Sequence, residues 1–177
     1  LSIQGSLCVR DTGSCGTGAG EIYTTSGNIV SIDVAENYPT YDLGIEAGDI
    51  VALSADTQSY TAPGSDSADP REETIGTLMK AQAGATEPVL GIVSTRPGLL
   101  FGYDITEVPV RPVALVGRVP VKVNLEGGPI KIGDRIGLSS VPGVGARAET
   151  GPTVGIALES WSGSGDEATS RLMVFVN

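Results

Sequence analysis

The sequence predicts an all-β protein, in which an internal duplication gives two related small barrel-like units after an extended N-terminal segment. A ten-residue phrase occurs twice, at 45–54 and 130–139, with five identical residues in register. An apolar Gly-Ile step follows each phrase, at 89–94 and 153–158, so the order of elements repeats as well. The 25 glycines and 11 prolines are spread along the chain, which favours short strands joined by turns over long helices.

The composition predicts an aliphatic core and excludes several classes of partner. Only 5% of the residues are aromatic, although 40% are hydrophobic. Eleven basic residues against 21 acidic ones give a net charge of −10, which repels phosphate backbones and anionic lipids, so we expect no nucleic-acid partner. No run approaches the roughly 18–20 apolar residues that span a bilayer, so we expect no membrane insertion. The chain opens at Leu1 without a signal-peptide pattern, as expected of a processed product, a cloned domain or a fragment.

Residues 1–30 are predicted to form the extended segment, with strands at 1–9 and 21–25. The two cysteines, Cys8 and Cys15, bracket a turn, and they form either a disulfide or two free thiols. A disulfide across so short a loop contributes about 2–3 kcal/mol in the chain-entropy treatment, and it favours an extracellular setting. The chain has no histidine and no second cysteine pair, so we expect no metal site there.

The first β unit is predicted at 31–108, with a turn and a strand at the repeated phrase. Glycine tolerates positive φ and aspartate bonds nearby backbone amides, so Asp49 and its counterpart Asp134 are predicted to be structural. Gly48 and Gly91 of this copy are separated by about 21 more residues than Gly133 and Gly155 of the second, roughly the length of its Ser/Asp/Pro-rich middle. We expect 61–74 to be a mobile surface loop. The segment 69–84 could open a helix, but the repeat favours a strand at 77–80.

The second β unit is predicted at 109–177. The run 109–123 alternates valines with other residues and is expected to be a long strand, which its prolines confine to an edge or a bend. A turn at 141–145 and a closing strand at 171–176 complete the unit.

Several phrases together resemble a known family. They resemble the C-terminal domains of bacterial tail-fibre-like surface proteins and, more remotely, the self-cleaving C-terminal domain of phage tail appendages. The resemblance covers about residues 30–177 and rests on the phrases at 33–39, 46–49, 90–94 with Pro97-Gly98, and 116–123. It implies a domain similar to an intramolecular chaperone, which trimerises the fibre above it and then severs itself through acidic residues.

These observations predict a structural C-terminal module of an extracellular or virion-associated fibre. We expect it to form a homo-oligomer, with a trimer favoured, to join an upstream stalk, and to contact a cell-surface glycan or protein. One alternative is a single-turnover autoproteolytic intramolecular chaperone, which would be the one enzymatic activity of the chain. Another is a secreted subunit that polymerises into filaments through donated strands. No cofactor is expected.

If the family's chemistry carries over, Asp33 and Glu36 match its acidic phrase. A carboxyl pair can act as general acid and base on one peptide bond when burial keeps one of them protonated. Positions i and i+3 of a regular strand face opposite sides, so this pair needs a bulge or a bend to converge. The alternative is that both solvate a strand end. No residue matches the family's second, distant acid, and Glu87 and Glu107 are the nearest candidates.

Other sites are weaker in the sequence. Tyr38, Tyr41 and Trp161 could line a sugar-binding surface or could be the few large residues that the core needs. Without histidine there is no Ser-His-Asp or Cys-His arrangement, and no phosphate-binding glycine pattern opens a helix. Four acidic residues could collect a calcium ion, but they fit no recognised loop spacing, so we expect a solvated acidic loop and no metal site. They are Asp66, Asp69, Glu72 and Glu73.

Overall fold

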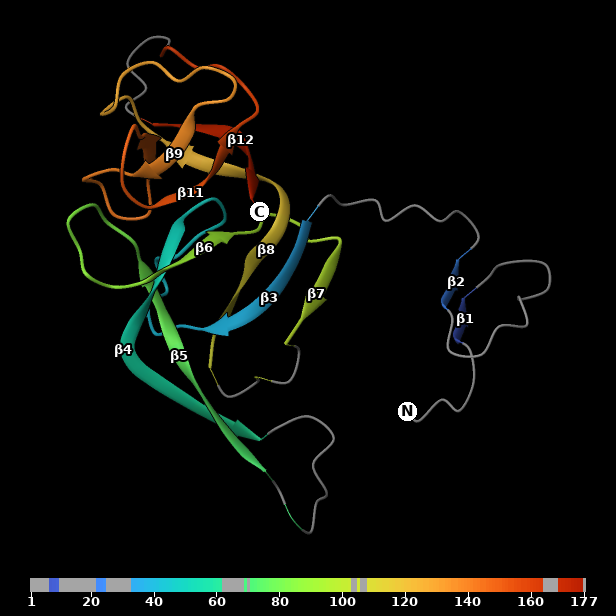
Figure 1. Ribbon diagram of the computed structural model, residues 1–177. Helices are drawn as coiled ribbons and strands as arrows, with labels where there is room; N and C mark the ends of the chain where they lie inside the picture. The colour runs from blue at the N-terminus through green and yellow to red at the C-terminus, as the bar shows by residue number, and fades with distance from the viewer. Residues whose placement is uncertain are drawn as a thin grey trace. The chain divides into compact units, whose positions relative to one another are not determined.

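The computed structural model describes residues 7–9, 22–24, 33–61, 69, 71–102, 105, 108–163 and 169–176. Every regular element in these ranges is a β-strand (Figure 1), which confirms the all-β prediction. The strands are β1 Leu7–Val9, β2 Ile22–Thr24, β3 Asp33–Pro39, β4 Ile50–Thr61, β5 Glu72–Lys80, β6 Val89–Val93, β7 Leu99–Phe101, β8 Val110–Val123, β9 Arg135–Leu138, β10 Gly145–Arg147, β11 Thr153–Ala157 and β12 Ser170–Val176.

The chain divides into two units, Leu1–Val30 and Ser31–Asn177. In the first unit, β1 pairs with β2 in parallel, with Leu7 opposite Ile22. The expected bond between Cys8 and Cys15 depends on atoms outside the described part of the chain, so it stays a prediction.

In the second unit, five strands close into a barrel. The order β8–β12–β11–β9–β10 returns to β8 through a parallel contact of Gly145 with Val123. We call these strands the C-terminal barrel. Its interior is filled by β-branched and other small aliphatic side chains with 0–2% exposure, as the low aromatic content requires. They include Val119, Val121, Ile136, Ala157, Leu172 and Val174.

The remaining strands form what we call the N-terminal strand group: β3, β4, β5, β6, β7 and the first half of β8. Along the sheet they run β8–β6–β4–β5, while β3 pairs with β8 on one side and β7 on the other. A parallel bridge between Thr40 and Leu78 joins the end of β3 to β5. The largest buried cluster combines Ile50 and Ile92 of this group with the barrel interior, so one core runs through both parts.

The two copies of the repeated phrase have the same backbone geometry. Gly48 and Gly133 lie at φ of 87° and 90°, where a side chain is strained. The carboxylates of Asp49 and Asp134 each accept the backbone N–H three residues earlier, at 2.9 Å and 2.8 Å. The predicted structural role of both aspartates agrees with this arrangement.

In both copies, the strand that begins within the phrase also pairs in the same way with the strand that contains the Gly-Ile step. Gly48 N–H donates to the carbonyl of Val93 and Gly133 N–H to that of Ala157, each at 2.9 Å. The N–H groups of Val93 and Ala157 donate back to the aspartate carbonyls, again at 2.9 Å. Both pairings then shift register next to Gly91 and Gly155, which lie two residues before Val93 and Ala157.

The β4–β5 hairpin corrects the prediction for the middle of the first unit. Residue 61 ends β4, and 72–74 begin β5, so both ends of the expected loop are strand. The strand expected at 77–80 is confirmed and is longer, and the helical alternative does not form. Figure 1 shows this hairpin projecting well beyond the sheet. We call its outer part, Thr57–Thr61 paired with Glu72–Gly76, the arm.

Strand β8 overturns part of the proline prediction. It does not lie at an edge: β3 and β6 flank its first half, and β12 pairs along its second half. Figure 1 shows it bending as it passes from the N-terminal strand group into the barrel, which is the other expected solution. Pro112 is tolerated because its carbonyl accepts Ser94 N–H, so its nitrogen faces away from the β3 ladder. Pro120 lies opposite Met173, whose carbonyl accepts the N–H of Leu158 directly after β11, so β12 requires no donor from this proline.

Candidate functional site

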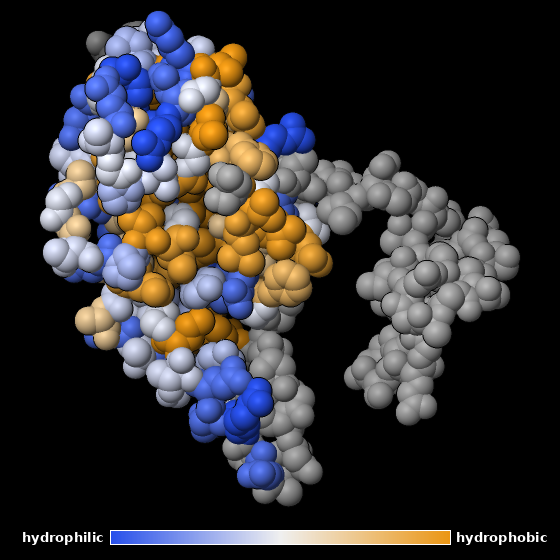
Figure 2. Space-filling model, in the orientation of Figure 1, coloured by the Kyte–Doolittle hydropathy of each residue, from blue (hydrophilic) through white to orange (hydrophobic). Residues whose placement is uncertain are grey.

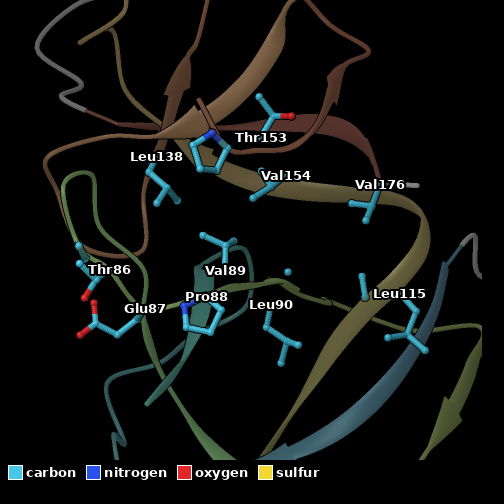
Figure 3. Close-up of a pocket in the computed structure, with 14 residues that line it drawn as sticks. Thr86, Glu87, Pro88, Val89, Leu90, Leu115, Leu138, Thr153, Val154 and Val176 are labelled. Atoms are coloured by element: carbon cyan, nitrogen blue, oxygen red, sulfur yellow. The ribbon is translucent and has the colours of Figure 1, made fainter. Parts of the chain in front are cut away.

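A groove of about 560 Å³ lies between the N-terminal strand group and the C-terminal barrel. Its lower wall comes from β6 and the loop before it, and its upper wall from the ends of β9, β11 and β12. Figure 3 shows the side chains of the two walls facing one another. The lining is Ala85, Thr86, Glu87, Pro88, Val89, Leu90, Gly91, Ala114, Leu115, Leu138, Pro152, Thr153, Val154 and Val176.

The groove is set in an apolar part of the surface. Leu115, in its lining, is 45% exposed, and its neighbour Val116 is 44% exposed. On β7, which pairs with β3 on the side away from β8, Leu99 and Phe101 are also about half exposed. Figure 2 shows apolar side chains gathering across the middle of this face, with hydrophilic ones above and below. Large contiguous apolar areas are uncommon on monomers and mark interaction sites.

The groove offers little for acid–base chemistry. Glu87 is the one ionisable side chain in its lining, so no carboxyl pair forms there. Sequence reasoning considered Glu87 as a partner for Asp33 and Glu36, but β8 lies between β6 and β3 in the sheet. The structure therefore does not bring Glu87 to these residues, and Glu107 lies outside the described ranges. The arrangement of the groove suits binding of an apolar surface.

Asp33 and Glu36 lie in β3 on alternating positions. Burial alternates along the whole strand, with Asp33 buried at 6% exposure and Glu36 half-buried. A register shift relative to β8 does occur between Val34 and Ala35, yet the alternation continues through it. The two carboxyls therefore face opposite sides of the strand. In the described part of the chain, Asp33 Oδ2 has no hydrogen-bond partner although it is buried.

Glu36 is bound by Tyr38 instead. The Tyr38 hydroxyl donates to Glu36 Oε2 at 3.1 Å, as the i and i+2 positions of a strand allow. Burial, and then the charge of Glu36 and this hydrogen bond, raise the pKa of Tyr38. The Tyr38 phenol therefore stays neutral and keeps its donor hydrogen at neutral pH.

The three aromatic residues considered for sugar binding have separate surroundings. Tyr38 packs against a cluster that includes Val51 and Val113, while Trp161 packs against the large core cluster. Tyr41 is 55% exposed, and its hydroxyl donates to Gln58 at 2.7 Å beside the root of the arm.

The junction of the two parts holds a buried carboxylate between two ammonium groups. Asp49, 1% exposed, lies 3.1 Å from Lys80 Nζ and 2.7 Å from Lys122 Nζ. Lys122 also lies 3.0 Å from Glu46. Burial works to lower the pKa of Lys122, but its hydrogen bonds to the two carboxylates and their charges outweigh this and raise it. The cluster joins the turn before β4 to the ends of β5 and β8, so its role is structural.

The acidic residues considered for calcium do not form a site where the structure shows them. Glu72 accepts the Thr61 hydroxyl and Glu73 accepts the Tyr60 hydroxyl, both across the arm. Asp69 is exposed, and Asp66 lies outside the described ranges. No group of three or more metal-ligating side chains occurs among the residues that the structure describes. In the same ranges there is no helix of the length and hydropathy needed to cross a membrane.

Comparisons with protein-family models, with curated proteins and with solved structures find no match to this chain. The functional proposal for this chain therefore rests on the geometry of the groove itself. Sequence reasoning missed it because its walls come from segments more than twenty residues apart in the chain. The one available signal was the surplus of aliphatic residues in 110–123, where Leu115 and Val116 break the valine alternation.

Proposed function

We propose that the chain is the structural C-terminal module of an extracellular or virion-associated fibre and that it promotes oligomer formation. The observation that carries this is the apolar groove beside half-exposed Leu115 and Val116. Covering such a surface is favourable by about 25 cal/mol for each Å² removed from water. An aliphatic groove with a single carboxylate is better suited to packing against an apolar surface of another subunit than to binding polar ligands.

We propose further that the two parts of the chain arose by duplication of one five-stranded unit. In chain order, β3, β4, β5, β6 and the first half of β8 correspond to the second half of β8, β9, β10, β11 and β12. Matching hydrogen bonds at Gly48 and Gly133 support this, as do matching register shifts at Gly91 and Gly155. The bridge of Thr40 with Leu78 would then correspond to the contact that closes the barrel.

Light scattering during size-exclusion chromatography, over a range of concentrations, tests the oligomer proposal. We expect a closed oligomer, with a trimer favoured, and a shift toward monomer in Leu115→Asp. Leu43→Asp is the matched control, because Leu43 is 71% exposed and does not line the groove. A monomer at every concentration, or equal behaviour of the two variants, would contradict the proposal. Filaments seen by electron microscopy would instead support the polymerising secreted subunit.

A second candidate function, self-cleavage, is favoured by one observation: Asp33 is buried and one of its oxygens has no partner among the described residues. A buried carboxyl oxygen that is not already bonded is available to a reacting group, as general acid–base chemistry requires. The test is intact mass spectrometry of the chain carrying an upstream extension, with and without Asp33→Asn. A fragment that appears in the parent and not in the variant supports self-cleavage, and an uncut parent rules it out.

A further inference from the structure

Four exposed side chains form a continuous row across the outer face of the C-terminal barrel. Arg135 of β9 is opposite Ile156 of β11, Ile156 is opposite Phe175 of β12, and Phe175 is opposite Arg118 of β8. Directly opposed residues in a sheet project to the same side. Their neighbours along these strands, among them Val119, point into the barrel core. We call these four residues the arginine row.

The arginine row combines uncovered apolar area with uncompensated positive charge. Ile156 is 42% exposed and Phe175 is 38% exposed, and both arginines are exposed. In the part of the chain that the structure describes, no carboxylate lies within ion-pair distance of Arg118 or Arg135. A hollow of about 250 Å³ lies at the Arg135 end, lined in part by Val154 and Ile156. In a chain with a net charge of −10, two unpaired arginines around an apolar centre are a specific feature.

The arm is acidic, in contrast to the arginine row. The sequence segment 54–76, which includes both strands of the arm, contains five acidic residues and one arginine. Hydroxyl and carboxylate groups bond across it, with Ser59 bonded to Thr74 at 3.0 Å and Thr61 to Glu72 at 3.1 Å. The arm is a two-stranded ribbon beyond the register shift at Leu53, and such ribbons are only marginally stable without packing on something else.

The arm and the arginine row belong to opposite ends of one chain. Figure 1 shows β4 and β5 extending away from the C-terminal barrel, while β9, β11 and β12 lie at the other end. The arm therefore cannot reach the row of its own chain, and a contact between the two must join different copies. Such a contact uses different surfaces on the two partners, so it closes into a ring or continues as a filament.

We propose that the acidic arm of one copy docks on the arginine row of a second copy. Charge complementarity carries the proposal: the arm supplies Glu72 and Glu73, of which Glu73 is also paired with Arg71, and Asp56 directly precedes the arm on β4. The row supplies Arg118 and Arg135 around an apolar centre. The inference rests on the oligomer proposal and assigns to it a specific pair of surfaces, distinct from the groove.

Sedimentation equilibrium of single variants tests the row. Arg118→Glu should weaken self-association about tenfold, since loss of one favourable charge contact is worth roughly that factor. Arg96→Glu is the matched control, because Arg96 is also exposed and makes the same change of charge in a loop after β6. Circular dichroism of both variants establishes that each is folded.

A charge exchange then identifies the arm as the partner. Glu72→Arg alone should weaken association, and Glu72→Arg combined with Arg118→Glu in one chain should recover most of it. If the parent is monomeric throughout, the oligomer proposal fails and this inference with it. If the parent associates but Arg118→Glu behaves like Arg96→Glu, the inference alone fails. If Arg118→Glu weakens association and the exchange does not restore it, the arm is not the partner and the proposal is overturned.

Discussion

The ammonium group of Lys122 lies 2.7 Å from the carboxylate of Asp49 and joins the middle of the chain to the turn before β4. Lys80 approaches the same carboxylate from β5, at 3.1 Å. Asp134 forms the corresponding turn in the second copy of the repeated phrase, where no such pair is found among the described residues. The turn at Asp134 is thus a local bend, whereas the turn at Asp49 is also a joint that connects three segments through its ion pairs.

Asp49→Asn should lower the free energy of unfolding by about 3–5 kcal/mol, because it leaves two ammonium groups beside a neutral amide in a buried position. Urea titration followed by circular dichroism measures the loss. Asp134→Asn is the control, and we expect it to cost at most about 1 kcal/mol, because its exposed turn keeps an acceptor for the same backbone N–H. Equal losses in the two variants would show that the turn, and not the ion pairs, carries the stability.

Asp33→Asn should leave the free energy of unfolding unchanged or raise it by about 1 kcal/mol, since one oxygen of this buried carboxyl, Oδ2, has no hydrogen-bond partner among the described residues. The same titration applies. A loss comparable to that of Asp49→Asn would mean that the carboxylate of Asp33 is held by groups outside the described ranges.

Gly143→Ala should be more destabilising than Gly151→Ala. Both glycines have left-handed backbones, at φ of 79° and 86°, so both substitutions cost about 1–2 kcal/mol in strain. A Cβ at Gly143 would also lie 3.1 Å from Asp49 Cγ, whereas one at Gly151 meets nothing within 4 Å. The difference between the two unfolding free energies therefore isolates crowding at the joint, and we expect about 1–3 kcal/mol.

Acid should destabilise the fold in part through Glu126. The backbone N–H of Ser140, and then its hydroxyl, lower the pKa of Glu126 below its usual value of 4.5. A carboxyl with a lowered folded-state pKa stabilises the protein above its unfolded value, and this is lost as the pH falls through the folded value. Thermal melting at neutral pH and below about pH 4.5 should therefore show a smaller acid-induced drop in Glu126→Gln than in the parent. Glu149→Gln, at an exposed glutamate, should match the parent.

High pH should also destabilise the fold, in this case through Lys122. Its pKa is raised above the usual 10.5, so its contribution is complete below that value and is lost as the pH rises through the folded-state pKa. We therefore expect little change in the melting temperature between neutral pH and pH 10.5, then a fall that Lys122→Met abolishes. A steep loss well below this pH in the parent would contradict the assignment.

The sequence predicts the strands and turns well where local chemistry decides them. The turns at Gly48 and Gly133 follow from the freedom of glycine and the short side chain of the next residue, and both were found. The arm was missed because its polar residues satisfy one another across the hairpin instead of solvating a loop. Solvent-exposed ribbons and loops have similar compositions, so polarity does not separate them.

The site was less predictable than the fold, since it depends on which segments meet. The prolines of β8 suggested an edge, but their missing donors face away from the neighbouring ladder, which only the pairing register determines. The acidic pair at Asp33 and Glu36 was recognised as a phrase, yet strand alternation places its members on opposite sides. The groove and the arginine row are both formed by strands that are distant in sequence, so no local sequence pattern predicts them.

The first half of β8 belongs to the N-terminal strand group and its second half to the C-terminal barrel. Neither part is therefore complete until this strand has paired. Its partner β3 precedes it by more than seventy residues, and pairings over such spans form slowly. The buried cluster that continues from Ile50 to Val174 ties the two parts together in the same way. The segment 33–176 should therefore melt in a single transition, and a protease that cuts within 110–123 should unfold both halves at once.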